Sequence, residues 1–254
     1  MTVSTTSSFR IVALCLVTLG LAACSVPGPG DAPQGIHDPY EAENRRVHAF
    51  NRAIDERLFR GDGPGLTERL PEGVTVSVLN VADTLSLPQT VVNQVLQGRL
   101  GRATTNSLRF GVNATLGFGG LADVASGLGM PRDETDFGET LYVWGAPEGA
   151  YLELPVLGPS TEREAAGRVV DLFTDPLGYV LQTRPRMAAT VIQAGASAID
   201  RGQFSDTIES VLYESTDSYD QLRLIYLQKR RFDLGDTTTG AVEEDPLALD
   251  TEGF

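Results

Sequence analysis

The feature that most restricts the fold is an apolar segment near the N-terminus that is too short to cross a bilayer. Arg10 precedes a charge-free run from Ile11 to Ala23. At about 1.5 Å per residue, a helical run of this length falls well short of the ~30 Å hydrocarbon core. A positive residue followed by a short apolar run is typical of a secretory signal. We therefore expect residues 1–23 to be a signal peptide that is removed from the mature chain.

The apolar run ends in Leu21-Ala22-Ala23-Cys24, which resembles the bacterial lipobox, where the signal is cut before a cysteine that is then lipidated. The alternative is an ordinary signal whose cleavage site lies next to a cysteine by chance. Cys15 would leave with the signal, so Cys24 alone remains and no disulfide can form. Acyl chains on Cys24, at about 0.8 kcal/mol per buried methylene, would hold the protein on a membrane. Ser25 after the cysteine favours the outer membrane.

Proline, glycine and capping residues divide the rest of the chain into a linker, one domain and a tail. Residues 24–37 hold the acylated cysteine and a flexible Pro/Gly tether, and residues 38–232 form a helical domain. Residues 233–254 are acidic and are expected to be disordered. No uncharged run in the domain is long enough to cross a bilayer. We expect a chain that is anchored to a membrane without spanning it.

Helix start and stop signals predict a mainly α domain with at most short strands. The first helix begins at Asp38-Pro39-Tyr40-Glu41 and ends near Phe59, and its expected apolar face consists of Val47, Phe50, Ile54 and Leu58. The other predicted segments are a helix or strand over 72–81, a helix from a capping box at Ser86 to Gly98, a helix over 99–116, a short helix from Asp136 to Trp144, an extended segment over 151–154, a helix from Thr161 to Phe173, a helix opened by Asp175-Pro176, and helices over 185–213 and 217–231.

Residue types that carry chemistry are scarce. The histidines are His37 and His48, both expected to be solvated surface side chains, and the net charge of −14 argues against nucleic acid. The single lysine, Lys229, follows no glycine, so a Walker-type phosphate loop is excluded. Gly117-Phe118-Gly119 is followed by Ala122 where a dinucleotide fingerprint needs its third glycine. We expect no enzyme activity, no cofactor and no metal site.

The domain carries an ordered series of short motifs. They are Asp38-Pro39-x-Glu41-x-x-Asn44-Arg45, Asn51 with Asp55, Leu87-Pro88, Asn93, Leu96-Gln97-Gly98, Arg109-Phe110, Asn113, Gly117-x-Gly119-Gly120-x-x-Asp123-x-Ala125, Asp136-Phe137-Gly138-x-Thr140-Leu141, and Gly149-x-Tyr151-Leu152-x-Leu154-Pro155-x-x-Gly158-Pro159-Ser160. In this order, behind a lipobox, they resemble the MlaA family, also called VacJ, of outer-membrane lipoproteins in the phospholipid-retrieval system.

The resemblance implies a ring of amphipathic helices around a central channel, partly embedded in the outer membrane and facing the periplasm. Phospholipids misplaced in the outer leaflet would enter the channel and pass to a soluble periplasmic carrier of the MlaC kind, which maintains lipid asymmetry. It also implies association with a trimeric porin. The alternative is a structural outer-membrane lipoprotein that scaffolds porins or envelope assembly without moving lipid.

The glycine-rich stretch is the candidate lipid path, because irregular backbone at membrane depth must be buried in protein or face a wet cavity. The candidate residues are Phe110, Asn113, Thr115, Leu116, Gly117, Phe118, Gly119, Gly120 and Leu121. The alternative is a glycine-rich turn in an ordinary helical core. Arg102 and Arg109 are expected to form surface ion pairs rather than to contact head-group phosphates. Tyr142, Trp144 and Tyr151 fit a membrane interface or the core equally well.

Overall fold

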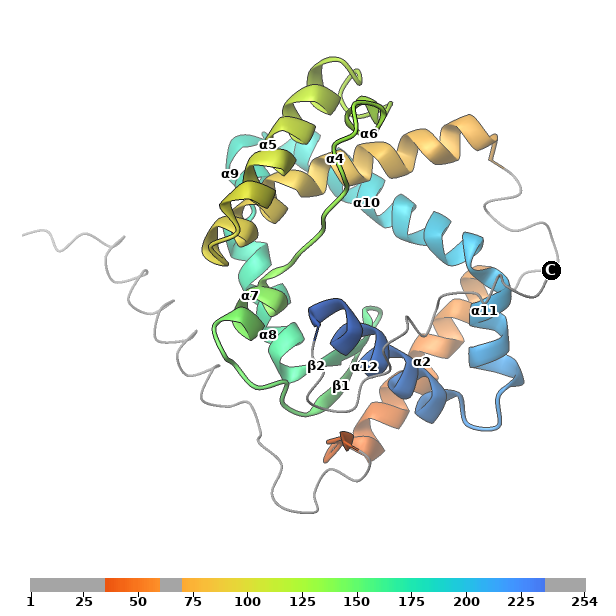
Figure 1. The fold of residues 1–254 in the computed structure, drawn as a ribbon. Helices are drawn as coiled ribbons and strands as arrows, with labels where there is room; N and C mark the ends of the chain where they lie inside the picture. The colour runs from red at the N-terminus through yellow and green to blue at the C-terminus, as the bar shows by residue number, and fades with distance from the viewer. Residues whose placement is uncertain (1–34, 60–69, 236–254) are drawn as a thin grey trace, which may run out of the picture.

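A computed structural model describes residues 35–59 and 70–235. The predicted signal peptide, Cys24 and most of the acidic tail lie outside the described residues. As predicted, the domain is mainly α-helical with two short strands (Figure 1). Its elements are α2 (Glu41–Phe59), α4 (Glu72–Leu96), α5 (Leu100–Thr115), α6 (Val124–Gly127), α7 (Phe137–Val143), β1 (Tyr151–Leu154), β2 (Gly158–Thr161), α8 (Glu162–Thr174), α9 (Pro176–Val180), α10 (Thr183–Gln203), α11 (Ser205–Glu209), the π-helix η2 (Ser210–Glu214) and α12 (Ser218–Leu234).

The elements follow one another around a ring, as the resemblance implies (Figure 1). The long helix α4 packs against α5 on one side and α10 on another, and α7 packs against α8. The strands form an antiparallel hairpin in which Tyr151 pairs with Thr161 and Leu154 with Gly158. This hairpin contacts α2, α8 and α12. The first and last helices are therefore brought together at the hairpin, on the side of the ring opposite α4.

Three helix starts form as their capping residues predict. The side chains of Asp136, Thr161 and Asp175 accept hydrogen bonds from the backbone N–H groups of Glu139, Glu164 and Leu177, respectively. Each bond satisfies a backbone donor that lacks a partner within its own helix. The caps place α7, α8 and α9 where the sequence indicates.

Two predicted boundaries are wrong. Residues 72–96 form one continuous helix, with Pro88 inside it, rather than a helix that restarts at Ser86. The Ser86 hydroxyl donates to the carbonyl of Asp83 within the same helix. An internal proline costs about 3 kcal/mol, and the packing of α4 against both α5 and α10 offsets that cost. The predicted helix over 185–213 divides instead at Phe204, where the backbone leaves helical geometry between α10 and α11.

The predicted apolar face of the first helix is only partly correct, since Val47 and Ile54 are half-buried. Asn44 and His48 are the buried side chains of α2, whereas Phe50 and Leu58 are exposed. His48 is not a solvated surface residue, because its Nε2 lies 2.9 Å from the Ser218 hydroxyl in a hydrogen bond. The prediction assumed that apolar residues face inward. In this helix the most deeply buried side chains are polar.

Candidate functional site

The reversal seen in α2 extends through the described residues. Buried polar or charged side chains outnumber buried apolar ones, many of which are alanines. Large apolar side chains are exposed on most helices, including Phe118 at 82% and Leu172 at 77%. Monomeric proteins in water rarely expose large apolar patches, and they bury polar groups only when these are hydrogen-bonded. The distribution is typical of a protein with a polar interior and an apolar environment around part of its surface.

Amide side chains form the centre of the polar interior. Asn93, Gln94 and Asn106 are completely buried. The Asn106 Nδ2 donates to Gln94 Oε1 at 3.1 Å and to the carbonyl of Asp133 at 2.7 Å, which connects α4, α5 and the segment before α7. Asn93 Nδ2 donates to Asp171 Oδ1 at 3.0 Å, which connects α4 to α8. The ring is therefore held together by directional polar contacts rather than by a large apolar core.

A narrow polar cleft, open to solvent, lies beside this network and has room for about one water molecule between its walls. It lies between α4, the C-terminal half of α5 and the segment that runs from α6 to α7. Its lining residues are Asn80, Asp83, Ser86, Leu87, Thr90, Arg109, Asn113, Asp123, Arg132, Asp133 and Glu134. The lining combines carboxylates, guanidinium groups and amides with a single leucine, so the surface of the cleft is strongly polar and charged.

Arg109 and Asp123 form a buried ion pair at one wall of the cleft. The Arg109 Nη2 donates to both carboxylate oxygens of Asp123, at 3.2 and 3.1 Å, while its Nη1 donates to the carbonyl of Met130. Burial opposes ionisation of Asp123, but hydrogen bonds from Ser126 and Asn113 and the charge of Arg109 lower its pKa to about 2. The pairing of Arg109 was expected, but at the surface. Its side chain is instead buried, and the ion pair fixes the loop after α5.

The opposite wall of the cleft carries charges that the sequence analysis missed. Arg132 donates to Asp83 of α4 at 2.7 Å and to Glu134 at 2.6 Å. Burial raises the pKa of Asp83; Arg132 opposes that shift, and the charges of Glu134 and Asp200 add to it. Asp83 lies within the apolar stretch of α4, and Arg132 and Glu134 lie in an irregular segment. No short-range pattern brings them together, because the contact depends on how α4 and the later segment pack.

The glycine-rich loop closes the C-terminal end of α5 and is not a phosphate cradle. The backbone N–H groups of Gly117, Gly119 and Gly120 donate to the carbonyls of Val112, Ala114 and Asn113. A Cβ on Gly120 would lie 2.7 Å from the Thr84 hydroxyl, so this glycine allows the loop to approach α4 closely. The N–H groups of these three glycines therefore serve the end of the helix and are not free to bind a phosphate.

The predicted site residues separate into an inward and an outward group. Asn113 lines the cleft, donating to Asp123 at 3.0 Å and accepting from the backbone N–H of Ala125. Leu116, Phe118 and Leu121 are exposed on the loop, which we call the apolar loop surface. Of the remaining predicted residues, Thr115 is exposed and donates to the carbonyl of Gly111, and Phe110 is half-buried.

The aromatic residues also divide between interior and surface. Tyr151 is buried, and its hydroxyl donates to Glu153 at 2.6 Å. Trp144 is half exposed, and its indole N–H donates to the carbonyl of Leu96. Tyr151 therefore belongs to the core, while Trp144 is available at the surface.

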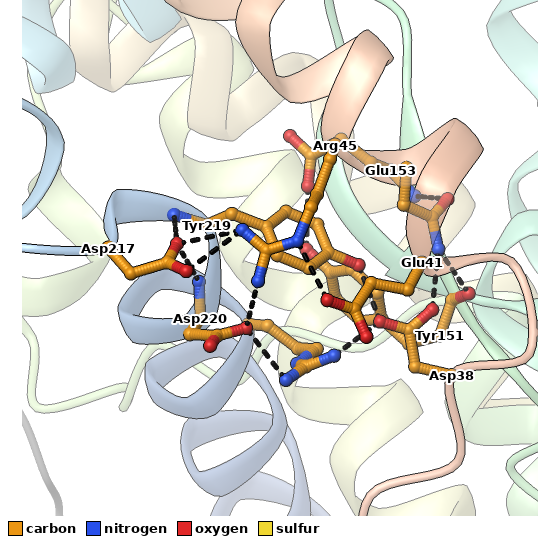
Figure 2. A network of polar contacts seen from close by, with 10 residues as sticks. Asp38, Glu41, Arg45, Tyr151, Glu153, Asp217, Tyr219 and Asp220 are labelled. Atoms are coloured by element: carbon orange, nitrogen blue, oxygen red, sulfur yellow. Dashed lines mark hydrogen bonds and ion pairs between the residues drawn. The ribbon is translucent and has the colours of Figure 1, made fainter.

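A second polar network joins the first and last helices (Figure 2). The Asn44 amide accepts from the backbone N–H of Glu153 and donates to the carbonyl of Tyr151, so a side chain pairs with strand β1 as another strand would. Arg45 donates to Asp217 at 2.9 Å and to Asp220 at 3.0 Å, both on or beside α12. The N-terminal motif of the sequence thus serves to close the ring.

Asp38, which precedes α2, makes tertiary contacts. Its carboxylate accepts hydrogen bonds from the Asn44 amide at 2.9 Å, from the Tyr219 hydroxyl at 2.5 Å and from Arg223. The last two donors belong to α12. The residue that precedes the first helix is therefore held by the last one.

Comparisons with known proteins agree with this architecture. The family described as MlaA lipoprotein matches residues 36–233. An uncharacterized protein of Rickettsia prowazekii is 37% identical over 145 residues, which cover 57% of this chain and 58% of that one. The intermembrane phospholipid transport system lipoprotein MlaA of Escherichia coli K12 is 31% identical over 228 residues, covering 88% of each chain.

A solved structure also resembles the fold. A chain from work on the structural basis for maintenance of bacterial outer membrane lipid asymmetry superimposes with a TM-score of 0.64 and 28% identity, covering 78% of this chain and 98% of that one. The match spans nearly all of the solved chain, so the likeness is one of whole folds. With the family match over 36–233, these findings confirm the resemblance expected from the motifs. The chain belongs to the MlaA lipoprotein family.

Proposed function

We propose that this chain is a non-enzymatic phospholipid transporter of the outer membrane. It removes mislocalised phospholipids from the outer leaflet and passes them to a soluble periplasmic carrier, which maintains the lipid asymmetry of the membrane. The relative in Escherichia coli is named for intermembrane phospholipid transport, and the similar solved structure concerns outer membrane lipid asymmetry. Both support the proposal.

The observation that carries the proposal is the reversed distribution of polar and apolar side chains. A phospholipid that leaves a bilayer must bring a charged head group past hydrocarbon, and a wet, polar path lowers that cost. Exposed polar groups at the cleft, among them Arg132 and Glu134, would line such a path, while residues such as Phe118 and Leu172 expose apolar surface. Among residues 35–59 and 70–235, no helix is long and apolar enough to cross a membrane. In this proposal the exposed apolar side chains hold the ring partly within one leaflet.

Within this proposal, residues 110–129 form part of the lipid path. The head group passes the polar surface beside Asn113, and the apolar loop surface of Leu116, Phe118 and Leu121 contacts acyl chains. Residues 1–23 act as the signal peptide, and acylated Cys24 anchors the domain through the linker that ends at residue 37. A trimeric porin holds the protein in the outer membrane.

The apolar loop surface provides the sharpest test. Phe118 is 82% exposed and has a φ of 54°, in the left-handed region that asparagine tolerates better than phenylalanine. Phe118→Asn should therefore keep the fold while removing the apolar contact. Gly145→Asn is the matched control, because Gly145 lies outside residues 110–129, has a φ of 86° and has open space around its Cβ position.

Each variant is expressed in a strain deleted for the native gene. Phospholipid on the cell surface is then measured with a membrane-impermeant amine reagent. The wild type and Gly145→Asn should restore low surface phospholipid, and Phe118→Asn and Cys24→Ala should not. If the deletion strain itself shows normal surface phospholipid but defective envelope assembly, the scaffold function is correct and the transport proposal is wrong.

A further inference from the structure

The end of α8, the short helix α9 and the first half of α10 form a corner of the fold that exposes large apolar side chains. The Tyr179 hydroxyl donates to the Phe173 carbonyl at 2.5 Å, which holds α9 against the end of α8. We call the exposed apolar residues here the α9 corner; they are Leu172, Phe173, Tyr179, Val180, Met187 and Val191, each between 64% and 77% exposed.

The fold buries α10 only in its second half. Its buried side chains are Ala196 and Ile199, whereas none of the side chains of residues 183–191 is buried. In a water-soluble protein, an apolar stripe on a helix packs against the rest of the chain. Met187 and Val191 lie one turn apart on α10 and are both exposed instead. The apolar surface of the α9 corner is therefore available to a partner outside the chain.

The charges beside this apolar surface are all positive. Residues 176–199 contain no acidic residue, and their charged side chains are Arg184 and Arg186, both exposed. This contrasts with the net charge of −14 of the whole chain. The preceding carboxylates are half-buried and already used within the fold: Asp171 accepts hydrogen bonds from α4 and α7, and Asp175 caps α9.

Neither arginine has a carboxylate partner among the described residues. The Arg186 Nη1 donates to the Gly178 carbonyl at 3.4 Å, and Arg184 makes no hydrogen bond or ion pair within the part of the chain that the structure describes. Both arginines lie in the first turn of α10, where the helix dipole disfavours cations and favours anions. An anionic group beside them would therefore be stabilised by the two side chains and by the helix dipole.

A lipid leaflet presents hydrocarbon and phosphate side by side, which are the two chemistries that this corner matches. We propose that the α9 corner docks on an anionic phospholipid surface. Tyr179, Val180 and Met187 enter the acyl-chain region, and the long side chains of Arg184 and Arg186 extend to the lipid phosphates. The inference rests on the proposed location at the outer membrane. It adds to the acyl anchor a second attachment point that depends on lipid charge.

The size of the effect follows from the number of cations. A basic residue near an anionic membrane increases binding about fivefold, so two increase it about thirtyfold. Phosphatidylcholine carries a phosphate but no net charge, whereas phosphatidylglycerol is anionic. Vesicles of the two lipids therefore distinguish an anionic surface from phosphate as such.

The test uses the full-length acylated lipoprotein, reconstituted into vesicles of phosphatidylcholine alone or with an equal part of phosphatidylglycerol. Met187→Cys supplies a free thiol, because the chain after the signal peptide has no cysteine besides Cys24. Its rate of reaction with a membrane-impermeant maleimide reports docking. Phosphatidylglycerol should slow this reaction by up to about thirtyfold. Adding Arg184→Gln and Arg186→Gln to the same protein should abolish most of the difference between the two vesicles.

Two controls separate docking from general effects of charge and of the vesicles. Arg46→Gln with Arg57→Gln removes the same charge from exposed positions on α2 and should leave the protection intact. Thr216→Cys places the thiol in the exposed loop between η2 and α12, and it should react equally fast in both vesicles.

Equal reaction rates of Met187→Cys in the two vesicles would refute the inference, as would protection that survives the loss of both arginines. Protection that occurs in native outer-membrane fractions but not in either vesicle would assign the corner to a protein partner and would also overturn it. Transport is measured separately, as surface phospholipid in the deletion strain. A protein that restores low surface phospholipid without charge-dependent protection refutes this inference alone, whereas one that docks but leaves surface phospholipid high refutes the transport proposal alone.

Discussion

Gly167 on α8 lies directly against the first turn of α7, and Gly167→Ala should destabilise the domain. A Cβ at this position would lie 2.3 Å from the backbone N of Gly138 and 2.7 Å from its Cα. Backbone atoms cannot rotate away, so the two helices must move apart. Overpacking of this kind costs about 1–3 kcal/mol, and a backbone clash belongs at the upper end. Alanine in a helix returns about 1 kcal/mol relative to glycine. The expected net loss in the free energy of unfolding is therefore about 2 kcal/mol.

The assay is urea unfolding in mild detergent, followed by the helical circular dichroism signal. Gly111→Ala is the control, because Gly111 lies in the interior of α5 with open space where its Cβ would be. That variant should be more stable than the wild type by about 0.5–1 kcal/mol. The two substitutions are chemically identical, so their opposite signs isolate the helix crossing. A Gly167→Ala protein as stable as the wild type would refute the reasoning.

Three further predictions concern the loop, the cleft and the ring closure. Gly119→Ala and Gly120→Ala both place a side chain in left-handed backbone, which costs about 1–2 kcal/mol. Only the Cβ of Gly120→Ala also clashes with Thr84 of α4, so this variant should have the lower melting temperature and the weaker lipid retrieval. Equal effects of the two substitutions would contradict this prediction. The pKa of Asp123 is lowered from 3.8 to about 2, so its ionised carboxylate stabilises the fold fully above about pH 4. The difference in stability between the wild type and Asp123→Asn should therefore shrink as the pH falls from about 4 through 2. A constant difference over this range would contradict the assigned pKa. Asp55 and Arg201 form an ion pair at 2.6 Å, and both side chains are 14% exposed. Asp55→Asn and Arg201→Gln should each lower the free energy of unfolding by about 2–3 kcal/mol. In a double-mutant cycle, the double variant should lose clearly less than the sum of the two single losses.

The local features of the fold could be predicted because they depend on neighbouring residues. Asp136, Thr161 and Asp175 cap helices within three residues of themselves, and that interaction is readable from spacing alone. The predicted helix restart at Ser86 was wrong because the effect of Pro88 depends on distant residues. The penalty of a proline inside a helix is local, but the packing that offsets it comes from α5 and α10, which lie elsewhere in the chain.

The direction in which side chains face could not be predicted from periodicity. The usual rule places apolar residues inward because the surroundings are water. In α2 the rule fails: Asn44 and His48 face inward and Phe50 is exposed. The candidate site shows the same division. Asn113 was predicted and lines the cleft, whereas Asp83 lies in a helix whose neighbours are mostly apolar and gave no signal.

The network between α2 and α12 also determines when the ring can close during synthesis of the chain. The partners of Arg45 lie 172 and 175 residues further along the chain. At about 5–20 residues per second, roughly 10–35 s pass between synthesis of this arginine and of the carboxylates that receive it. During that time Asn44 can already pair with β1, but Arg45 has no carboxylate partner from α12, and contacts of such long sequence separation form slowly. A truncated product that ends before α12 therefore cannot form the ion pairs that join the first helix to the last, and the ring closes on that side only when α12 has been synthesised.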